Sequence, residues 1–156
     1  MGLRSGVEAD YEQALQQIAL RLRKTIRLSG VAIALRDDNG DCVKCVAASG
    51  FSAPPVGTVL DPRRGLSAEC LRSGDTKVAN DSELDPRVNR DACRRNGIRS
   101  TVVVPLVRDG SPIGILGVYS ERPNYFSDRQ VFLLVFIASF ISHLPLQSPA
   151  AEEVLI

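Results

Sequence analysis

The sequence lacks the features that mark several specialised classes of protein. Its formal net charge is only +1, which gives no support for nucleic acid or a membrane surface as a partner. The longest apolar run, Val131–Ile141, is interrupted by Ser139 and is shorter than the roughly 20 apolar residues that cross a bilayer. The N-terminal residues have no apolar core of the kind found in signal peptides. We therefore expect a cytoplasmic protein whose partners include neither nucleic acid nor membrane.

Histidine and cysteine are also scarce, which limits the metal and catalytic chemistry open to the chain. His143 is the only histidine, so we expect neither a multi-histidine metal site nor a Ser-His-Asp arrangement in the middle of the chain. The four cysteines are too few for a disulfide scaffold and fit a reducing compartment. Cys42 and Cys45 lie three positions apart in an expected strand, so their side chains point to opposite faces and cannot readily share a metal. We expect no metal site and no bound cofactor.

The length and composition are those of a single globular domain. The chain has 156 residues, of which 44% are apolar and 24% charged, and these are ordinary values for a globular protein. A chain of this length buries about 68–70% of its unfolded surface and needs neither metal nor disulfides for stability. We expect one domain over residues 7–144 and a flexible tail or linker over residues 145–156.

Apolar residues recur at helical spacing near both ends of the chain. From Val7 to about Leu28 they recur every three or four residues and form one stripe. Near the other end, Ser127 and Gln130 have the spacing of a capping box, and Leu144-Pro145 would stop the helix that follows. A long helix is therefore expected at each end of the domain.

The middle of the chain is rich in segments with the pattern of strands joined by turns. Four of these segments are expected to form two hairpins: Val31–Arg36 with Cys42–Ser49, and Ser100–Val107 with Ile113–Ser120. Asn39-Gly40 suits both central positions of a primed turn in the first hairpin, and Asp109-Gly110 closes the second. Shorter elements are expected between the hairpins: a helix over Ser67–Arg72, a strand over Lys77–Ala79 and a helix over Pro86–Arg95. Two hairpins favour an antiparallel sheet in an α+β (mixed α/β) fold.

Four short blocks in the second half of the sequence occur in the order and spacing of a known family. The blocks are Gly65–Gly74, Asp81–Val88, Gly97–Leu106 and Ile113–Ser120. With these blocks the chain resembles the GAF family of sensory modules, over about residues 7–144 once the first helix and hairpin are included. The resemblance implies a profilin-like central antiparallel sheet of five or six strands with the terminal helices on one face. It also implies that short helices and loops between Phe51 and Gly97 form a pocket on the other face.

The same resemblance implies a regulatory module that binds a small molecule. Members of the family bind cyclic nucleotides, bilins, haem, small acids or no known ligand, and they signal to an attached output domain, which here would belong to a longer protein. The residues expected to contribute to the pocket come from several segments: Phe51, Val59, Leu66, Cys70, Val78, Asp81, Cys93, Arg99, Val102 and Tyr119. We expect binding without catalysis, so the domain is interpreted as a sensor and not as an enzyme.

Cys93 has four competing interpretations. A covalent bilin is disfavoured, because the attachment cysteine of bilin-binding members would fall near Val88, and Arg94 instead of histidine follows Cys93. The family's free methionine sulfoxide reductases use cysteines in this neighbourhood, which makes Cys93 with Cys70 a candidate pair. Their Gly-x-Cys-Gly segment is not matched, however, since Ser67 stands at its cysteine position. A redox sensor is the third interpretation, and an ordinary packing cysteine, the favoured one, is the fourth.

Arginines are frequent in the expected pocket segment. Eight occur between residues 63 and 99, and a guanidinium fork suits carboxylate or phosphate, so an anionic ligand is one alternative. Seven acidic residues lie in much the same stretch, and most of these charges are expected to be solvated or paired with one another. Asp81 is expected to accept hydrogen bonds from loop N–H groups, and Arg99 to pair with a pocket-side carboxylate. Structural and ligand-binding roles for these two residues stay equally open.

The last helix carries a second apolar stripe beside the one expected to pack on the sheet. This second stripe consists of Phe132, Val135, Phe136 and Phe140. A helix that is apolar on two sides is normally covered on both, and a large exposed apolar patch often marks an interface. The first helix would cover part of the stripe and a second copy of the chain the rest, so we expect a homodimer through the terminal helices.

Two functions from other classes compete with the sensor interpretation. One is a thiol-dependent enzyme that resembles the free methionine sulfoxide reductases and uses Cys93 with Cys70. The other is a pure dimerisation module that binds no ligand because its pocket is filled by side chains. Turnover would identify the first, and a packed core without a cavity would identify the second.

Overall fold

The two expected hairpins and a short additional strand join into one sheet. The computed structural model describes residues 6–144, and the tail expected over residues 145–156 lies outside them. The strands are β1 (Gly30–Arg36), β2 (Val43–Ser49), β3 (Lys77–Ala79), β4 (Ser100–Arg108) and β5 (Ser111–Ser120). Their order across the sheet is β2-β1-β5-β4-β3, and every neighbouring pair is antiparallel. The antiparallel α+β fold predicted from the hairpins is confirmed, with five strands.

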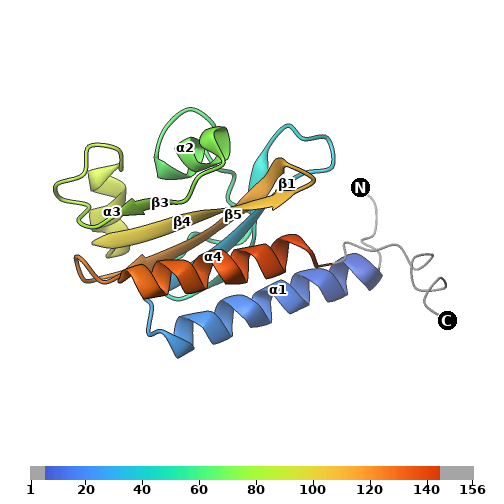
Figure 1. Ribbon diagram of the computed structural model, residues 1–156, viewed down its shortest axis with the longest axis horizontal. Coiled ribbons are helices and arrows are strands. Elements are labelled where there is room, and N and C mark those ends of the chain that lie inside the picture. The colour runs from blue at the N-terminus through green and yellow to red at the C-terminus, as the bar shows by residue number, and fades with distance from the viewer. Residues whose placement is uncertain (1–5, 145–156) are drawn as a thin grey trace.

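Helices cover both faces of the sheet, and the two faces differ in character (Figure 1). The long helices α1 (Gly6–Thr25) and α4 (Asp128–Ser142) cover one face, with α1 packed on β1 and β2 and α4 packed on β4 and β5. The short helices α2 (Leu66–Ser73) and α3 (Arg90–Asn96) lie with their loops on the other face. This arrangement leaves the loop-rich face free to form hollows, because short helices cover a sheet less completely than long ones.

Strand alternation divides the apolar residues between two cores. Successive side chains of a strand point to opposite faces, so Val102, Val104 and Leu106 of β4 pack under α1 and α4, whereas Val103 points the other way. The larger core lies under the terminal helices and includes Leu15, Ile33, Leu116, Leu134 and Ile141. The smaller core lies under α2 and includes Ala34, Leu66, Cys70, Ala79 and Ile115.

The sequence predicted the second hairpin turn correctly and the first one incorrectly. Asp109 and Gly110 have φ of 51° and 78°, the pair of positive values that a primed turn requires. Asn39 has no positive φ, so the primed turn expected at Asn39-Gly40 is wrong. There Asp37 organises a longer loop, because its carboxylate accepts a 2.9 Å hydrogen bond from the Asp41 N–H, while its own N–H donates to the Cys42 carbonyl at 2.9 Å.

Side-chain caps set the start of two helices. The expected capping box of α4 is confirmed, with the Gln130 N–H donating to Ser127 Oγ at 3.2 Å and the Gln130 side chain accepting from the Ser127 N–H at 2.7 Å. Helix α3 begins at Arg90 instead of Pro86, because Asn89 Oδ1 accepts a 3.0 Å hydrogen bond from the Ala92 N–H and acts as the N-cap. Asn89, three residues later than predicted, is therefore the true start signal.

Candidate functional site

A hollow lies on the face away from the terminal helices, between α2, α3 and the strands beneath them. This α3 hollow has a volume of about 160 Å³. Its apolar walls include Leu66, Val88, Ile98 and Val103. Hydrogen-bonding side chains also line it: Ser67, Asn89, Asn96, Thr101 and Tyr119. None of the side chains that line the α3 hollow is an aspartate, glutamate, lysine or arginine, so the site favours a small ligand held by apolar contact and neutral hydrogen bonds.

Tyr119 provides a hydrogen-bonding group in the α3 hollow. A Cβ built at Gly117, two residues earlier on the same face of β5, would lie 2.7 Å from the Tyr119 hydroxyl, so the glycine makes the space in which the phenol lies. No hydrogen bond to this hydroxyl is formed within residues 6–144. Burial raises the pKa of Tyr119, with smaller contributions from Cys45 and Cys93, so the phenol stays protonated and can donate a hydrogen bond.

The cysteines near the α3 hollow are protonated thiols at neutral pH. Cys93 of α3 lines the hollow, and burial raises the pKa of its thiol, with a further contribution from the Glu83 carboxylate. Cys70 of α2 is completely buried in the smaller core, where burial raises its pKa to about 12, and its Sγ lies 3.7 Å from the Val103 carbonyl oxygen. Cys70 does not line the α3 hollow, so the expectation that both cysteines face one pocket is wrong.

Asp81 and Arg99 form a clasp between the loop after β3 and the start of β4. The Arg99 guanidinium donates from Nε and Nη2 to the Asp81 carboxylate over distances of 3.1–3.3 Å. Asp81 Oδ1 also accepts a 3.0 Å hydrogen bond from the Glu83 N–H. These are the contacts expected of the two residues, but neither side chain lines the α3 hollow. Asp81 instead borders a shallow depression at the β3 edge, together with Val78.

Three of the other expected pocket residues lie elsewhere. Val102 is completely buried in the core under α1 and α4, because it has the opposite strand parity to Thr101 and Val103. Val78 pairs with Val102 across the β3–β4 ladder and packs partly against the same core. Phe51 is 67% exposed, and its ring lies near the backbone of Gly97. The structure therefore brings together Leu66, Cys93 and Tyr119 from the predicted set.

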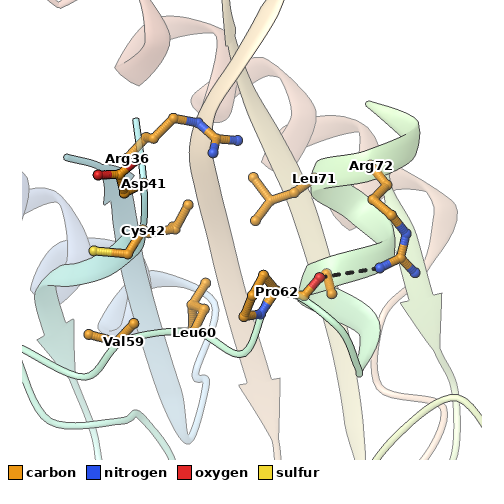
Figure 2. Close-up of a pocket in the computed structure, with 10 residues that line it drawn as sticks. Arg36, Asp41, Cys42, Val59, Leu60, Pro62, Leu71 and Arg72 are labelled. Carbon is orange, nitrogen blue, oxygen red and sulfur yellow. Dashed lines mark hydrogen bonds between the residues drawn. The ribbon is translucent and has the colours of Figure 1, made fainter. Parts of the chain in front are cut away.

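Val59 borders a separate hollow at the other end of α2, shown in Figure 2. This hairpin hollow lies between the β1–β2 hairpin, the loop of residues 59–62 and α2, and has a volume of about 230 Å³. Two arginines, Arg36 at the end of β1 and Arg72 in α2, border it from opposite sides. Apolar side chains form much of its wall: Val43, Val59, Leu60, Pro62, Ala68 and Leu71.

Several arginines of the loop-rich face pair with neighbouring carboxylates, as the sequence suggested. Arg94 Nη2 lies 2.6 Å from Glu83 Oε1, and this hydrogen bond lowers the pKa of Glu83. Arg87 Nη2 lies 2.6 Å from Asp85 Oδ2 and lowers the pKa of Asp85 in the same way. With the Arg99–Asp81 clasp, these pairs hold the loops around α3.

The apolar stripe on α4 is exposed to solvent. Phe132, Phe136 and Phe140 are 75%, 67% and 60% exposed, and Val135 is 41% exposed. A hollow of about 280 Å³ lies beside the C-terminal part of this stripe and is bordered by Phe136, Phe140 and Leu144. Helix α1 therefore does not cover these side chains.

Residues 6–144 contain no group of three or more His, Cys, Asp or Glu side chains placed to hold a metal ion. In that range, no helix combines the length and the apolar character needed to cross a membrane.

Together, the antiparallel sheet and the helices on both of its faces define a small two-faced α+β domain with a loop-bordered hollow. The GAF domain family model matches residues 8–144, and the chain belongs to the GAF domain family. The family resemblance inferred from the four sequence blocks is thereby confirmed. No curated protein matches the chain.

Solved structures with the same fold include GAF domains and enzymes. The GAF domain region of a Geobacter sulfurreducens protein is 23% identical, with a TM-score of 0.77, and the match covers 96% of this chain and 97% of that one. The free methionine-R-sulfoxide reductase of Neisseria meningitidis, solved with its substrate, is 26% identical, with a TM-score of 0.74 and coverage of 86% and 77%. The type II free methionine-R-sulfoxide reductase of Thermoplasma acidophilum is 21% identical, with a TM-score of 0.76 and coverage of 87% and 92%.

The expectation of binding without catalysis is corrected by these comparisons. It rested on membership of a family of sensory modules, but two of the similar structures are reductases. The fold of this chain is therefore shared by GAF domains and by enzymes. The reductases are similar to the chain only at moderate identity, so they establish what the fold can support.

Sequence reasoning missed several residues of the α3 hollow. Ser67, Asn89 and Thr101 line it and were not predicted to do so. Gly117 was missed as well, although a glycine inside a strand often marks a close approach of another group. Its spacing of two from Tyr119 was the available signal, since residues two apart share a face.

Proposed function

We propose that this GAF domain is a regulatory sensor that binds a small molecule in the α3 hollow and signals through a homodimer of its terminal helices. The observation that carries the proposal is the Tyr119 hydroxyl, which lies in the hollow and makes no hydrogen bond within residues 6–144. A hydroxyl that faces a hollow and has no protein partner is available to donate a hydrogen bond to a ligand acceptor. The ligand is therefore a small molecule with a hydrogen-bond acceptor opposite Tyr119.

The chemistry of the α3 hollow restricts the ligand further. Its lining residues carry no charged side chain, so a strongly charged ligand would be desolvated there without a partner. Leu66 and Val103 offer apolar contact, and Ser67 offers a hydroxyl. A compact, uncharged organic molecule fits these walls better than a nucleotide, whose phosphates need cationic or N–H partners.

A path from the hollow to the terminal helices runs through β4. Thr101 faces the α3 hollow, and the next residue, Val102, packs under the terminal helices. Further along β4, the Val107 N–H donates to Ser142 Oγ of α4 at 3.1 Å. A ligand that shifts β4 would therefore change the surface on which α4 packs, and an output domain attached in a longer protein would receive that change.

Binding can be tested by native mass spectrometry of the purified protein and by thermal denaturation against a library of small uncharged metabolites. We expect one class of compound to raise Tm in a concentration-dependent way. Ala92→Trp would fill the α3 hollow and abolish this shift, whereas Arg95→Trp, on the exposed side of the same helix, would keep it. Tyr119→Phe should weaken binding about tenfold, because it removes the donor. If Ala92→Trp and Arg95→Trp bind the compound equally well, the α3 hollow is not the site.

A second candidate function is thiol-dependent reduction of free methionine sulfoxide, favoured by the position of Cys93 in the hollow. Reducing a sulfoxide to a thioether releases the oxygen as water and oxidises two thiols to a disulfide. Cys93 would be the attacking thiol, with Cys70 or an added thiol as the second. Turnover of free methionine-R-sulfoxide with a dithiol reductant, abolished in Cys93→Ser and retained in Cys42→Ser, would support it. Absence of turnover in the parent protein would exclude this second function.

A further inference from the structure

The hairpin hollow is a second cavity that is independent of the α3 hollow. The two hollows share no lining residue, and they lie at different ends of α2. The hairpin hollow is also the larger of the two, at about 230 Å³ against about 160 Å³. The proposed sensor function uses only the α3 hollow and assigns no role to this one.

The two guanidinium groups at the hairpin hollow contrast with those near α3. Arg36 donates to the backbone carbonyls of Gly40 at 3.3 Å and Pro112 at 3.4 Å, and Arg72 donates to the Pro62 carbonyl at 3.4 Å. These contacts are long, and their acceptors are neutral. Within residues 6–144, neither arginine lies within 4.0 Å of a carboxylate oxygen, whereas Arg87, Arg94 and Arg99 do. Two cations at the rim of one cavity therefore hydrogen-bond only neutral acceptors, and Asp41 is the one carboxylate among the residues that line it.

The wall between these cations is apolar. Val43 and Ala68 are buried at the base, and Leu60 and Leu71 are half-buried beside them. Val59 is 53% exposed at the mouth and leaves contact area for a ligand. Figure 2 shows Leu71 between the two arginines, with Leu60 and Pro62 lower in the same view. The cavity thus offers positive charge at its rim and hydrocarbon contact within.

Two polar groups at the rim decide which anion fits. Asp41 adds a carboxylate, which would repel a doubly charged phosphate more than a singly charged carboxylate. The Cys42 thiol donates a hydrogen bond to the Asp37 carboxylate over 3.2 Å. A planar guanidinium fork also matches a carboxylate through two parallel hydrogen bonds.

We propose that the hairpin hollow binds a small organic monocarboxylate, with its carboxylate between Arg36 and Arg72 and its hydrocarbon body against Leu60 and Leu71. Such a ligand joins the β1–β2 hairpin to α2 and supplies a charged acceptor for two arginines that otherwise hydrogen-bond backbone carbonyls. The chemical class is a short hydrocarbon chain or ring that carries one carboxylate. Neutral and cationic molecules of the same size lack the group that the rim recognises.

The test uses the full chain and hexanoate as the probe, with backbone amide NMR shifts as the readout. We expect saturable shifts at the amides of Leu60 and Leu71, and no such shifts with hexylammonium. Arg36→Gln and Arg72→Gln should each raise the Kd for hexanoate about tenfold, because each removes one charge-assisted contact. Both side chains are exposed, so both variants should fold. Arg63→Gln, a nearby exposed arginine that does not border the hollow, should leave the Kd unchanged.

Two outcomes would overturn the proposal. Equal binding of hexanoate and hexylammonium would show that the rim does not select for an anion. Equal Kd values for Arg36→Gln, Arg72→Gln and Arg63→Gln would place the anion elsewhere. Ala92→Trp separates this site from the α3 hollow, since filling the α3 hollow should leave hexanoate binding unchanged. The sensor proposal and the hairpin-hollow proposal can therefore fail independently.

Discussion

Tyr11 on α1 combines a buried ring with a buried hydroxyl that has no hydrogen-bond partner within residues 6–144. Because an unsatisfied buried polar group is destabilising, Tyr11→Phe should raise the free energy of unfolding by about 1 kcal/mol. Burial raises the pKa of Tyr11, with Arg108 acting in the opposite direction. The folded chain therefore retains this proton at alkaline pH where the unfolded chain releases it, and this component of stability falls as pH rises above the ordinary tyrosine pKa.

Urea denaturation of the parent and variant at neutral and alkaline pH measures both effects of Tyr11→Phe. Tyr125→Phe is the matched control with the opposite sign, because the Tyr125 hydroxyl donates a 2.6 Å hydrogen bond to the Ile26 carbonyl. We expect Tyr125→Phe to lower the free energy of unfolding by about 1 kcal/mol. Equal destabilisation by both substitutions would show that the Tyr11 hydroxyl is satisfied in solution.

Cys42 is the most accessible of the four cysteines, since Cys45, Cys70 and Cys93 are buried. The hydrogen bond to the Asp37 carboxylate raises the pKa of Cys42, with burial and the charge of Asp37 adding to it. Thiolate is the reactive form of cysteine, so Asp37→Asn should lower the pH midpoint of Cys42 alkylation. Asp38→Asn, one residue further along the same loop, should leave the midpoint unchanged. An unshifted midpoint in Asp37→Asn would contradict the structure.

At the scale of elements, the capping box of α4 is a local feature with a measurable contribution. Ser127→Ala removes the oxygen that accepts from the Gln130 N–H and should lower the free energy of unfolding by about 1 kcal/mol. Ser139→Ala, on the exposed side of the same helix, should have little effect. Chemical denaturation of both variants tests the difference. Equal stability of Ser127→Ala and Ser139→Ala would mean that water replaces the cap at no cost.

Features that depend on near neighbours in the chain were accessible to sequence reasoning. Ser127 and Gln130 mark the start of α4, and Asp109-Gly110 closes the second hairpin. Both features could be predicted because each depends on residues only a few positions apart. The first hairpin turn was mispredicted since the Asp37 side chain offers hydrogen bonds that compete with a primed turn at Asn39-Gly40. Local patterns thus predict an element well when no side chain provides an alternative partner.

The candidate site was harder to predict because it depends on contacts between distant segments. Val102 was assigned to the pocket, yet strand parity places it under the terminal helices and gives Thr101 and Val103 to the hollow. The sequence shows that side chains alternate along β4. It does not show which alternate set faces the terminal helices and which faces the hollow. The separation of Val59 from Leu66 and Tyr119 into two hollows likewise depends on how α2 sits on the sheet.

At the scale of the whole molecule, the sheet separates two surfaces of different character. The loop-rich face holds both hollows, and the opposite face holds the terminal helices (Figure 1). Strand β4 contributes to both, through Thr101 on one side and Val102 on the other. A regulatory signal that starts in the α3 hollow would reach the terminal helices through this strand, so we expect its readout to be the packing or pairing of those helices.

The exposed stripe on α4 predicts that such a readout is dimerisation. Three phenylalanines at four-residue spacing are each at least 60% exposed, and apolar surface of this kind is stabilised when a second copy covers it. We expect the parent protein to sediment as a dimer at tens of micromolar. Phe136→Glu should convert it to a monomer, because the substitution places a charge at the centre of the stripe. A parent protein that sediments as a monomer at this concentration would exclude the interface.

The matched control for the dimer prediction is Phe51→Glu. Phe51 and Phe136 have the same exposed fraction of 67%, but Phe51 lies on the loop-rich side near Gly97. Both substitutions remove a similar apolar area and add one negative charge, so a general effect of charge or solubility would act equally on the two variants. Loss of the dimer in Phe136→Glu with retention in Phe51→Glu assigns the contact to α4. If both variants become monomers, the dimer does not depend specifically on the stripe. The proposal that a signal passes from the α3 hollow to a dimer of the terminal helices would then be contradicted.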